Sequence, residues 1–175
     1  MALGRFCSRL ILAAMMLGAS VSTGFSAKDS ATTTSGLPLP RYVSLKSDHV
    51  NVRAGPTKDN DVAWVYTRSG LPVEITAEFE NWRRVRDSEG AEGWVYHSLL
   101  SGRRTAVITM KTKDDLAALY DRPDTAGAVS ARLQAGVVAQ VKKCLTGWCR
   151  VTGNGFDGWI EQPRLWGVYA DEKVE

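Results

Sequence analysis

Apolar and polar side chains alternate along much of the chain between residues 42 and 169. The segment Val73–Glu78 reads Val-Glu-Ile-Thr-Ala-Glu, with an apolar side chain at every second position. A period of two places one face of a strand in a core and the other in solvent. The same period runs through Val50–Arg53, and Ala54-Gly55-Pro56 then ends that strand. We therefore predict an all-β chain of short strands and tight turns.

Short polar segments between the apolar ones predict where the chain turns. Glu80-Asn81 turns it into a strand over Trp82–Arg86, and Asp87–Gly90 turns it again into the next strand. About five short strands in such a unit are typical of a small barrel, which hides its sheet edges. The segment after Thr112 is ambiguous, because Thr112–Asp115 has residues that cap a helix. The repeat described next favours an extended segment or a single helical turn there.

The chain repeats itself at a spacing of 65 to 67 residues. Two tryptophans recur in the same order as their neighbouring glycines, a valine and a proline. A repeat of this length indicates one structural unit present twice. We predict two domains, residues 42–104 and 105–169, called here the first and second units. The repeated positions are Trp82/Trp148, Val85/Val151, Gly90/Gly155, Gly93/Gly158, Trp94/Trp159 and Pro56/Pro123.

Three motifs of the first unit resemble the bacterial SH3 domain: Val50-Asn51-Val52-Arg53-Ala54-Gly55-Pro56, Asn81-Trp82-Arg83-Arg84-Val85 and Glu92-Gly93-Trp94-Val95. Residues 41–104 as a whole are similar to secreted SH3-domain proteins of Gram-negative bacteria. The resemblance implies a five-stranded SH3-like barrel, a periplasmic address and a role in binding peptides or the cell wall. The second unit has Ala118–Pro123 in place of the first motif, which argues against equal ligand binding by the two units.

The N-terminus has the three parts of a secretory signal peptide. Arg5 and Arg9 precede an uncharged apolar run, Leu10–Val21, and small residues follow. We predict a signal peptide over residues 1–26, with cleavage after Ser26 and with Gly24 or Ala27 as alternative positions. A retained anchor is the alternative, but the apolar run has only about a dozen residues and a membrane-spanning helix needs ~20. We expect a periplasmic or secreted protein with no membrane anchor after cleavage.

The segments that flank the two units are polar. Residues 27–41 are small and contain Pro38 and Pro40, which predicts a flexible linker that stiffens toward its end. Residues 170–175 are charged, and we expect this tail to fray. Removal of residues 1–26 takes two arginines and no acid, so the mature chain carries 20 basic and 19 acidic residues. This near balance argues against a nucleic-acid partner.

Two cysteines remain after cleavage, Cys144 and Cys149. An even number of cysteines in an exported chain fits one disulfide. Four residues separate them, and we expect a hairpin with a four-residue loop to set them opposite each other, at a Cα separation of ~4.5–5.5 Å. The repeat aligns them with Glu78 and Arg83, which we expect to form a cross-strand ion pair. Metal ligation or nucleophilic catalysis by these thiols would need a local histidine or acid, which this hairpin lacks.

The chain shows little sign of catalytic chemistry. His49 and His97 are the only histidines, and the motifs of serine hydrolases, phosphate-binding loops and dinucleotide sites are absent. We therefore predict a non-enzymatic protein without cofactor or metal. Two alternatives stay open: a small cell-wall hydrolase, and an adaptor whose two barrels pack together as a rigid scaffold.

Aromatic side chains are the candidate binding groups. Trp82 and Trp94 have counterparts in the second unit, so they either form the common core or line a shallow groove for an extended peptide or a sugar face. Trp64 and Tyr66 have no aromatic counterpart, so the common fold does not need them and they are the better groove candidates. Arg53 is suited to a carboxylate. We predict these five residues as the site, with peptidoglycan or an envelope protein or peptide as the partner.

Overall fold

The protein is described by a computed structural model that covers residues 33–112 and 115–175. The predicted signal peptide, residues 1–26, lies outside the described residues, as does the first part of the predicted linker. Within the described ranges, no helix has the length and apolar character needed to cross a membrane.

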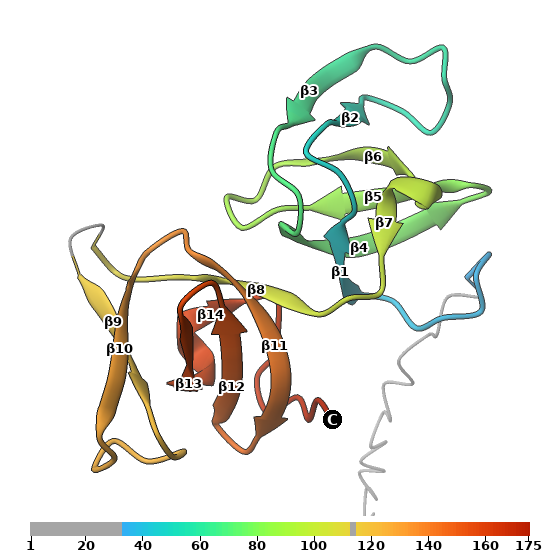
Figure 1. Ribbon diagram of the computed structural model, residues 1–175. Helices are drawn as coiled ribbons and strands as arrows, with labels where there is room; N and C mark the ends of the chain where they lie inside the picture. Colours follow the sequence, from blue (N-terminus) through green and yellow to red (C-terminus); the bar gives the residue numbers. More distant parts are fainter. Residues whose placement is uncertain (1–32, 113–114) are drawn as a thin grey trace, which may run out of the picture.

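Two antiparallel sheets, one in each unit, make up the fold (Figure 1). The first has the strand order β3-β2-β6-β5-β4-β1-β7. Its elements are β1 (Arg41–Leu45), β2 (Val50–Arg53), β3 (Val62–Tyr66), β4 (Pro72–Phe79), β5 (Trp82–Arg86), β6 (Glu92–Tyr96), the 3-10 turn η1 (His97–Leu99) and β7 (Leu100–Ser101). The predicted turns at Glu80-Asn81 and Asp87–Gly90 are confirmed, because each lies between consecutive strands of this sheet.

The second sheet has the order β10-β9-β13-β12-β11-β8-β14, which is the first order advanced by seven strands. Its elements are β8 (Thr105–Ile108), β9 (Leu116–Tyr120), β10 (Val129–Gln134), β11 (Val138–Leu145), β12 (Trp148–Gly153), β13 (Phe156–Glu161), the 3-10 turn η2 (Gln162–Arg164) and β14 (Leu165–Trp166). The prediction of an all-β chain with two tandem SH3-like units is confirmed. Each sheet has seven segments rather than about five, partly because a short last strand follows each 3-10 turn and pairs with the first strand.

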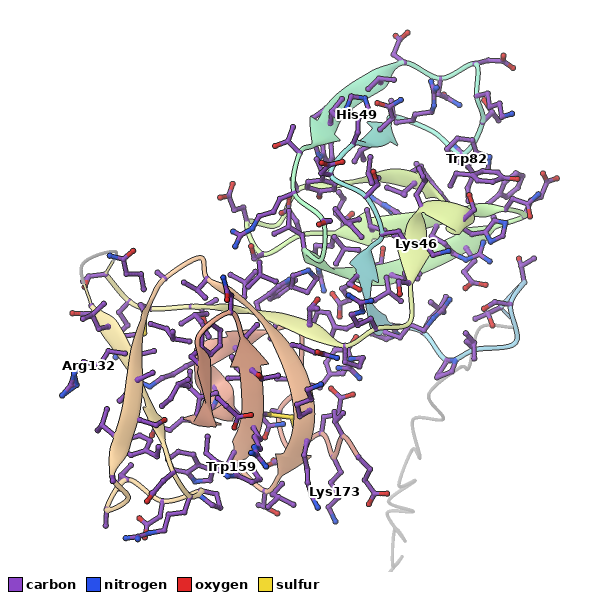
Figure 2. The ribbon with its side chains drawn as sticks, in the orientation of Figure 1. Lys46, His49, Trp82, Arg132, Trp159 and Lys173 are labelled. Carbon is purple, nitrogen blue, oxygen red and sulfur yellow. A yellow bond between two sulfur atoms is a disulfide. The ribbon has the colours of Figure 1, made fainter. Side chains whose placement is uncertain are left out.

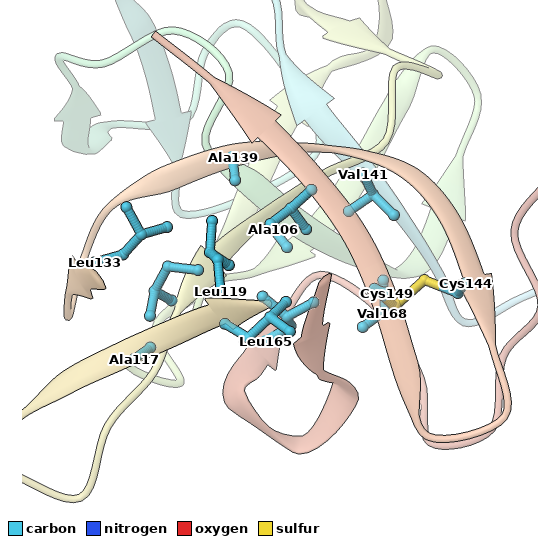
Figure 3. Close-up of a cluster of buried hydrophobic side chains, with 13 residues drawn as sticks. Ala106, Ala117, Leu119, Leu133, Ala139, Val141, Cys144, Cys149, Leu165 and Val168 are labelled. Carbon is cyan, nitrogen blue, oxygen red and sulfur yellow. A yellow bond between two sulfur atoms is a disulfide. The ribbon is translucent and has the colours of Figure 1, made fainter. Parts of the chain in front are cut away.

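Each sheet closes over its own apolar core. In β2, Val50 and Val52 are buried while Asn51 and Arg53 are partly exposed, as the period of two predicts. Full burial of one such valine stabilises the fold by ~1.5–3 kcal/mol. Figure 3 shows the second core, where the two cysteines pack among aliphatic side chains. The first core consists of Leu45, Val50, Val52, Val73, Ile75, Val85, Val95 and Leu100.

The repeat extends to hydrogen bonds outside the strand ladders. The amide of Leu45 donates to the carbonyl of Leu71 at 3.0 Å, and the amide of Ile108 donates to the carbonyl of Val137 at 2.9 Å. At the start of the 3-10 turns, the amide of His97 donates to the carbonyl of Asn81 in the β4–β5 turn at 2.9 Å. The amide of Gln162 donates to the carbonyl of Gly147 in the β11–β12 turn, also at 2.9 Å. Because the same backbone bonds recur, residues at equivalent positions in the two units are directly comparable.

Aromatic rings and a buried carboxylate join the two units. Tyr42 packs against Trp166 and Tyr169, with ring centroids 5.4 and 4.6 Å apart. The Tyr169 hydroxyl donates to Glu74 at 2.9 Å, and Arg86 forms an ion pair with the same carboxylate, which is only 3% exposed as a residue. Burial in this contact raises the pKa of the Tyr42 hydroxyl to about 12.

A close backbone approach at Gly167 completes this contact between the units. A Cβ atom at this position would lie 3.2 Å from the Cβ of Pro72 in the first unit and closer still to the carbonyl oxygen of Thr105. The φ of Gly167, 123°, also lies in a backbone region that residues with a side chain rarely adopt. A residue without a side chain therefore fits here, chiefly against β8 of its own unit and also against Pro72 of the first unit.

Both ends of the described chain are held against a sheet. In the predicted linker, the amide of Ser35 donates to Glu78 at 2.8 Å, and Leu39 packs against the first core. The expectation that residues 170–175 fray is wrong. Glu172 pairs with Arg104 at 2.6 Å, and the carbonyl of Val174 accepts from the amide of Cys144 at 2.8 Å. Composition does not reveal this outcome, because the charged residue Glu172 pairs with a residue far away in the sequence.

Candidate ligand-binding site

A pocket of about 310 Å³ lies on the outer face of the first sheet, where β2, β5 and β6 run side by side. The side chains of β2 and β6 that point away from the core form one part of it, and the 3-10 turn forms another. We call it the first-unit pocket. It is lined by Asn51, Arg53, Lys58, Trp82, Tyr96, Ser98 and Leu99.

Trp82 and Tyr96 form the aromatic wall of the first-unit pocket. They face each other across the β5–β6 ladder, with ring centroids 5.4 Å apart and planes at 80°. Such an edge-to-face pair contributes ~0.5–1.5 kcal/mol beyond the burial of its area. Trp82, labelled in Figure 2, is only 8% exposed, so it offers a rigid edge to the pocket. Tyr96 is half-buried and offers more of its ring.

The opposite side of the pocket is basic. Arg53 donates through Nη1 to the carbonyl of Asn60 at 2.6 Å, which ties the guanidinium to the loop between β2 and β3. The same loop carries Lys58, which is exposed, and is braced by a bond from Asn60 to Thr57 at 2.7 Å. Arg53 is therefore held in place before any ligand arrives.

The structure brings two of the five predicted residues, Arg53 and Trp82, into the first-unit pocket. Trp94 lies on the same outer face, paired with Arg53 on one side and Arg84 on the other, but does not line the pocket. The predicted site did not include the other pocket residues, Asn51, Lys58, Tyr96, Ser98 and Leu99. Asn51 and Tyr96 lie two positions from predicted site residues on the same strand, so strand periodicity held the signal for them. Lys58 comes from a loop and had none.

Trp64 and Tyr66 lie elsewhere. They pair with Val52 and Val50 across the β2–β3 ladder and so share the core face of the sheet, where both pack against the first core. The Tyr66 hydroxyl donates to Asp87 at 3.0 Å, and burial raises the pKa of Tyr66. Tyr66 lines a smaller pocket of about 220 Å³, with Val107 of the second unit on its other side.

The equivalent face of the second unit has different chemistry. Tyr120 stands where the first unit has Arg53, since each pairs with the tryptophan of the neighbouring strand. Its ring packs edge-on against Trp148, with centroids 5.7 Å apart. Glu161 stands where the first unit has Tyr96, and it pairs with Arg164 at 2.6 Å.

A larger pocket, about 470 Å³, lies beside Glu161. Its acid and its arginine neutralise each other, and none of the described residues that line it is aromatic. We therefore take the first-unit pocket as the candidate site. The larger pocket is lined by Thr109, Met110, Lys111, Glu161, Pro163 and Arg164.

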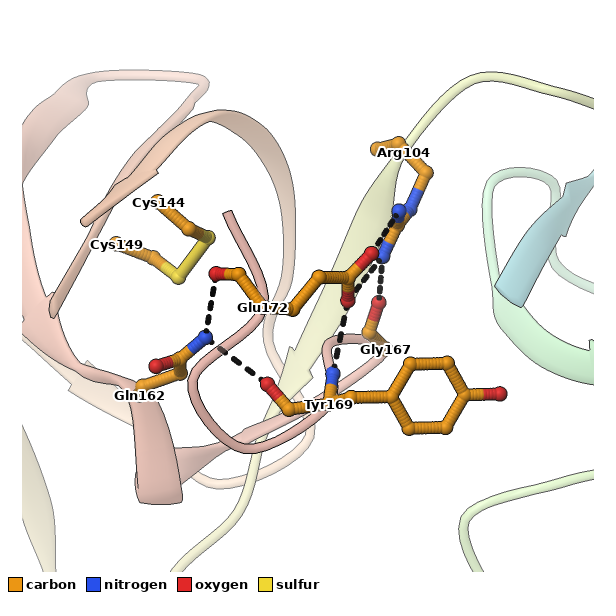
Figure 4. Close-up of a disulfide and its surroundings, with 7 residues drawn as sticks. All are labelled: Arg104, Cys144, Cys149, Gln162, Gly167, Tyr169 and Glu172. Carbon is orange, nitrogen blue, oxygen red and sulfur yellow. Dashed lines mark hydrogen bonds and ion pairs between the residues drawn. A yellow bond between two sulfur atoms is a disulfide. The ribbon is translucent and has the colours of Figure 1, made fainter. Parts of the chain in front are cut away.

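The predicted disulfide between Cys144 and Cys149 is confirmed, with an S–S distance of 2.02 Å. The predicted four-residue loop is wrong, because Leu145 also pairs with Trp148 and only two residues form the turn. The Cα separation is 4.1 Å, shorter than expected. Figure 4 shows the adjacent C-terminal segment, where the side-chain amide of Gln162 donates to the carbonyls of Tyr169 and Glu172 at 2.9 and 3.0 Å.

The predicted ion pair at the equivalent position of the first unit is also confirmed. Arg83 Nε lies 3.1 Å from Glu78 Oε1, and Arg41 lies 2.5 Å from the same oxygen. The Glu78 side chain is only 1% exposed. Burial alone would raise the pKa of Glu78, but hydrogen bonds from Arg41 and Ser35 and the charge of Arg83 outweigh it and lower the pKa.

Metal-binding side chains do not cluster in the part of the chain that the structure describes. Within residues 33–112 and 115–175, no group of three or more His, Cys, Asp or Glu side chains is arranged to hold a metal ion. Both cysteines of this part belong to the disulfide.

A sequence model of the bacterial SH3 domain matches the chain twice, over residues 46–102 and 113–167. The two matches together span more than half of the chain, and each covers one sheet except for its first strand, β1 or β8. The chain therefore belongs to the bacterial SH3 domain family, whose domains are binding modules. No curated protein matches the chain significantly.

Solved structures that resemble the chain include NlpC2 and NlpC1 from Trichomonas vaginalis, at 16% and 17% identity and TM-scores of 0.33 and 0.32. The match covers 73% and 72% of this chain and 48% and 45% of those chains. An NlpC/P60 family protein from Bacillus cereus is 13% identical at a TM-score of 0.28, with 77% of this chain and 58% of that chain covered. The chain thus spans about half the length of these structures.

Proposed function

We propose that this protein is an exported, non-catalytic binding protein of the bacterial envelope, whose first unit binds an extended peptide of peptidoglycan or of an envelope protein. The observation that carries the proposal is the first-unit pocket. It joins an aromatic wall, a side-chain amide and two basic groups, of which Arg53 is held in place by the backbone.

The chemistry of the pocket suits a peptide. The rings of Trp82 and Tyr96 offer apolar surface for a side chain, and aromatic surfaces of this kind recur in peptide recognition. The amide of Asn51 carries both donors and an acceptor, which match the donor and acceptor of a peptide backbone. The second unit has Ala118 and Glu161 at the positions of Asn51 and Tyr96, so the first unit is the binding unit of the pair.

Export is supported by the N-terminal sequence and the disulfide. The order of Arg5 and Arg9, the apolar run Leu10–Val21 and the small residues after it is that of a signal peptide. A disulfide persists in an oxidising compartment such as the periplasm. The non-catalytic part of the proposal rests on the absence of catalytic motifs from the sequence.

Co-sedimentation of the mature protein with purified peptidoglycan sacculi tests the proposal. We expect the wild type to sediment with sacculi and Tyr96→Ala to bind about tenfold more weakly, the equivalent of ~1.4 kcal/mol. Tyr120→Ala is the matched control, since Tyr120 packs on the equivalent tryptophan of the second unit. Equal binding by wild type and Tyr96→Ala would contradict the assignment of the pocket, provided that both variants keep the wild-type melting temperature within a few degrees.

The same assay separates the alternative functions. Release of soluble fragments from sacculi would contradict the non-catalytic assignment. Capture of an envelope protein, with no sedimentation on sacculi, would make the protein the adaptor in which the two barrels act as one scaffold. N-terminal mass analysis of the native protein tests export, and we expect a start near Ala27; an intact Met1 in the mature pool would contradict it.

A further inference from the structure

We infer that the first-unit pocket selects a ligand that carries a carboxylate: the anionic group lies between Arg53 and Lys58, and the adjoining apolar part of the peptide lies against Trp82 and Tyr96. This inference rests on the proposed function and names the chemical class of its ligand.

Arg53 is positioned to receive an anion. Its bond to the carbonyl of Asn60 uses one of the five N–H donors of a guanidinium. The planar fork of a guanidinium binds carboxylates through two parallel hydrogen bonds, and such charge-assisted bonds are roughly twice as strong as neutral ones. Because the backbone already orients Arg53, a ligand does not have to order this side chain, which reduces the entropic cost of binding.

The charged side chains that line the pocket have one sign. Arg53 and Lys58 line it, and none of the described lining residues is acidic. On the same sheet face, Glu92 is engaged by Arg84 at a distance of 2.6 Å and so does not oppose an incoming anion. A carboxylate that enters therefore meets two positive groups beside an apolar wall, where reduced solvation strengthens the attraction.

The second unit shows what removes this selectivity. At the position of Arg53 it has Tyr120, which packs on Trp148 and offers no positive charge. At the position of Tyr96 it has Glu161, which brings a carboxylate to the equivalent surface. Glu161 pairs with Arg164 at 2.6 Å, so this pair offers an anionic ligand neither a free positive charge nor an aromatic ring in place of Tyr96. The carboxylate site thus belongs to the first unit alone among the two faces described.

Two pairs of matched probes test the inference on the full mature protein. The first pair is acetyl-tetraalanine with a free C-terminal carboxylate and the same peptide as a C-terminal amide, titrated while the indole N–H resonance of Trp82 is followed by NMR. The second pair is native sacculi and sacculi whose carboxylates have been amidated. We expect each free acid to bind about tenfold more tightly than its amide, as one charge-assisted hydrogen bond provides. Added salt should narrow the difference.

Lys58→Gln is the test variant, because Lys58 is exposed in a loop and its loss leaves the core intact. We expect it to weaken binding of the free acid severalfold and to leave binding of the amide unchanged. Arg53→Gln should have the larger effect. Lys111→Gln, which removes a basic side chain from the pocket of the second unit, is the control and should change neither.

The outcomes separate this inference from the proposed function. Equal binding of acid and amide would overturn the inference and leave a peptide-binding pocket. Binding of the free-acid peptide without binding to sacculi would uphold the inference and assign the carboxylate to an envelope protein. Failure of all four probes to bind would overturn both.

Discussion

The β4–β5 and β11–β12 hairpins occupy equivalent places in the two units and are closed by different chemistry. In the first unit, Glu78 and Arg83 face each other as a buried ion pair. In the second unit, Cys144 and Cys149 face each other as a disulfide. In both units two facing residues thus join the strands near this turn, by an ion pair in the first unit and by a covalent bond in the second.

The two hairpins are also contacted by different segments of the chain. The segment before β1 supplies Ser35 and the start of β1 supplies Arg41, and both contact the carboxylate of Glu78. In the second unit, the segment before β8 is the connection from the first unit, so the C-terminus takes the equivalent role and Val174 pairs with Cys144. Each hairpin is therefore contacted by a segment from outside it: residues around the start of β1 in the first unit, and the C-terminal segment in the second. A buried ion pair needs this contact more than a disulfide does, because its charges must be satisfied by hydrogen bonds.

The largest effect should follow loss of Glu78. Glu78→Ala leaves Arg41 and Arg83, whose side chains are 16% and 10% exposed, without their carboxylate. Breaking a buried pair by removing one partner costs about 3–5 kcal/mol, and we expect a loss near 3 because both arginines keep other hydrogen bonds. Hydrogen exchange of the buried amides of β4 and β5 measures the change. The exposed Glu89→Ala is the control, with an effect within ~0.5 kcal/mol; a Glu78→Ala loss of similar size would show that the pair is dispensable.

Reduction of the disulfide should have the next largest effect. Cys144 and Cys149 close a loop of six residues, counted inclusively, and the chain-entropy estimate for such a loop is about 2 kcal/mol. We expect reductant to speed amide exchange in β11 and β12 while β4 and β5 keep their protection. The double variant Cys144→Ser with Cys149→Ser should already exchange at the faster rate and should not respond to reductant. Two titratable thiols in unreduced mature protein would refute the pairing.

Low pH should weaken the ion pair of the first hairpin but not the disulfide of the second. We expect this effect to be smaller than the two above. The pKa of Glu78 is lowered in the folded state, so the stability it contributes is present above its unfolded value of ~4.3 and is lost as the pH falls through the folded value. We expect Glu78→Gln to be less stable than wild type at neutral pH and to lose less stability between pH ~5 and ~3. Glu172, whose pKa is also lowered, acts in the same direction in the second unit, so the comparison is made between variants. Parallel pH profiles for wild type and Glu78→Gln would contradict the prediction.

The smallest effects should come from an exposed ion pair that occurs at the equivalent position in each unit. Arg84 lies 2.6 Å from Glu92, and Arg150 lies 2.8 Å from Asp157 at the equivalent position. All four side chains are substantially exposed, and pairs of this kind contribute ~0–1 kcal/mol. We expect Arg84→Ala and Arg150→Ala to lower the melting temperature by similar, small amounts. A large drop in melting temperature for only one variant would show that the two faces share a backbone arrangement but differ in the energetics of their side-chain pairs.

Local pattern in the sequence determined the strands, the duplication and the closures of both hairpins. These features depend on neighbours within one hairpin and on a period of two, and both can be counted along the chain. The pairing of Cys144 with Cys149 and of Glu78 with Arg83 follows from the same counting, because residues that flank a short turn face each other in an antiparallel ladder.

Tertiary structure alone decided the binding face and the fate of the termini. In β3, Val-Ala-Trp-Val-Tyr is apolar at every position, so the pattern does not say which face meets the core. Pairing with β2 settled it and placed Trp64 and Tyr66 beside Val52 and Val50, away from the pocket. Glu172 found Arg104 across 68 positions of sequence, and Lys58 reached the pocket from a loop. Contacts of this kind arise from how strands pack in space, and no local period records them.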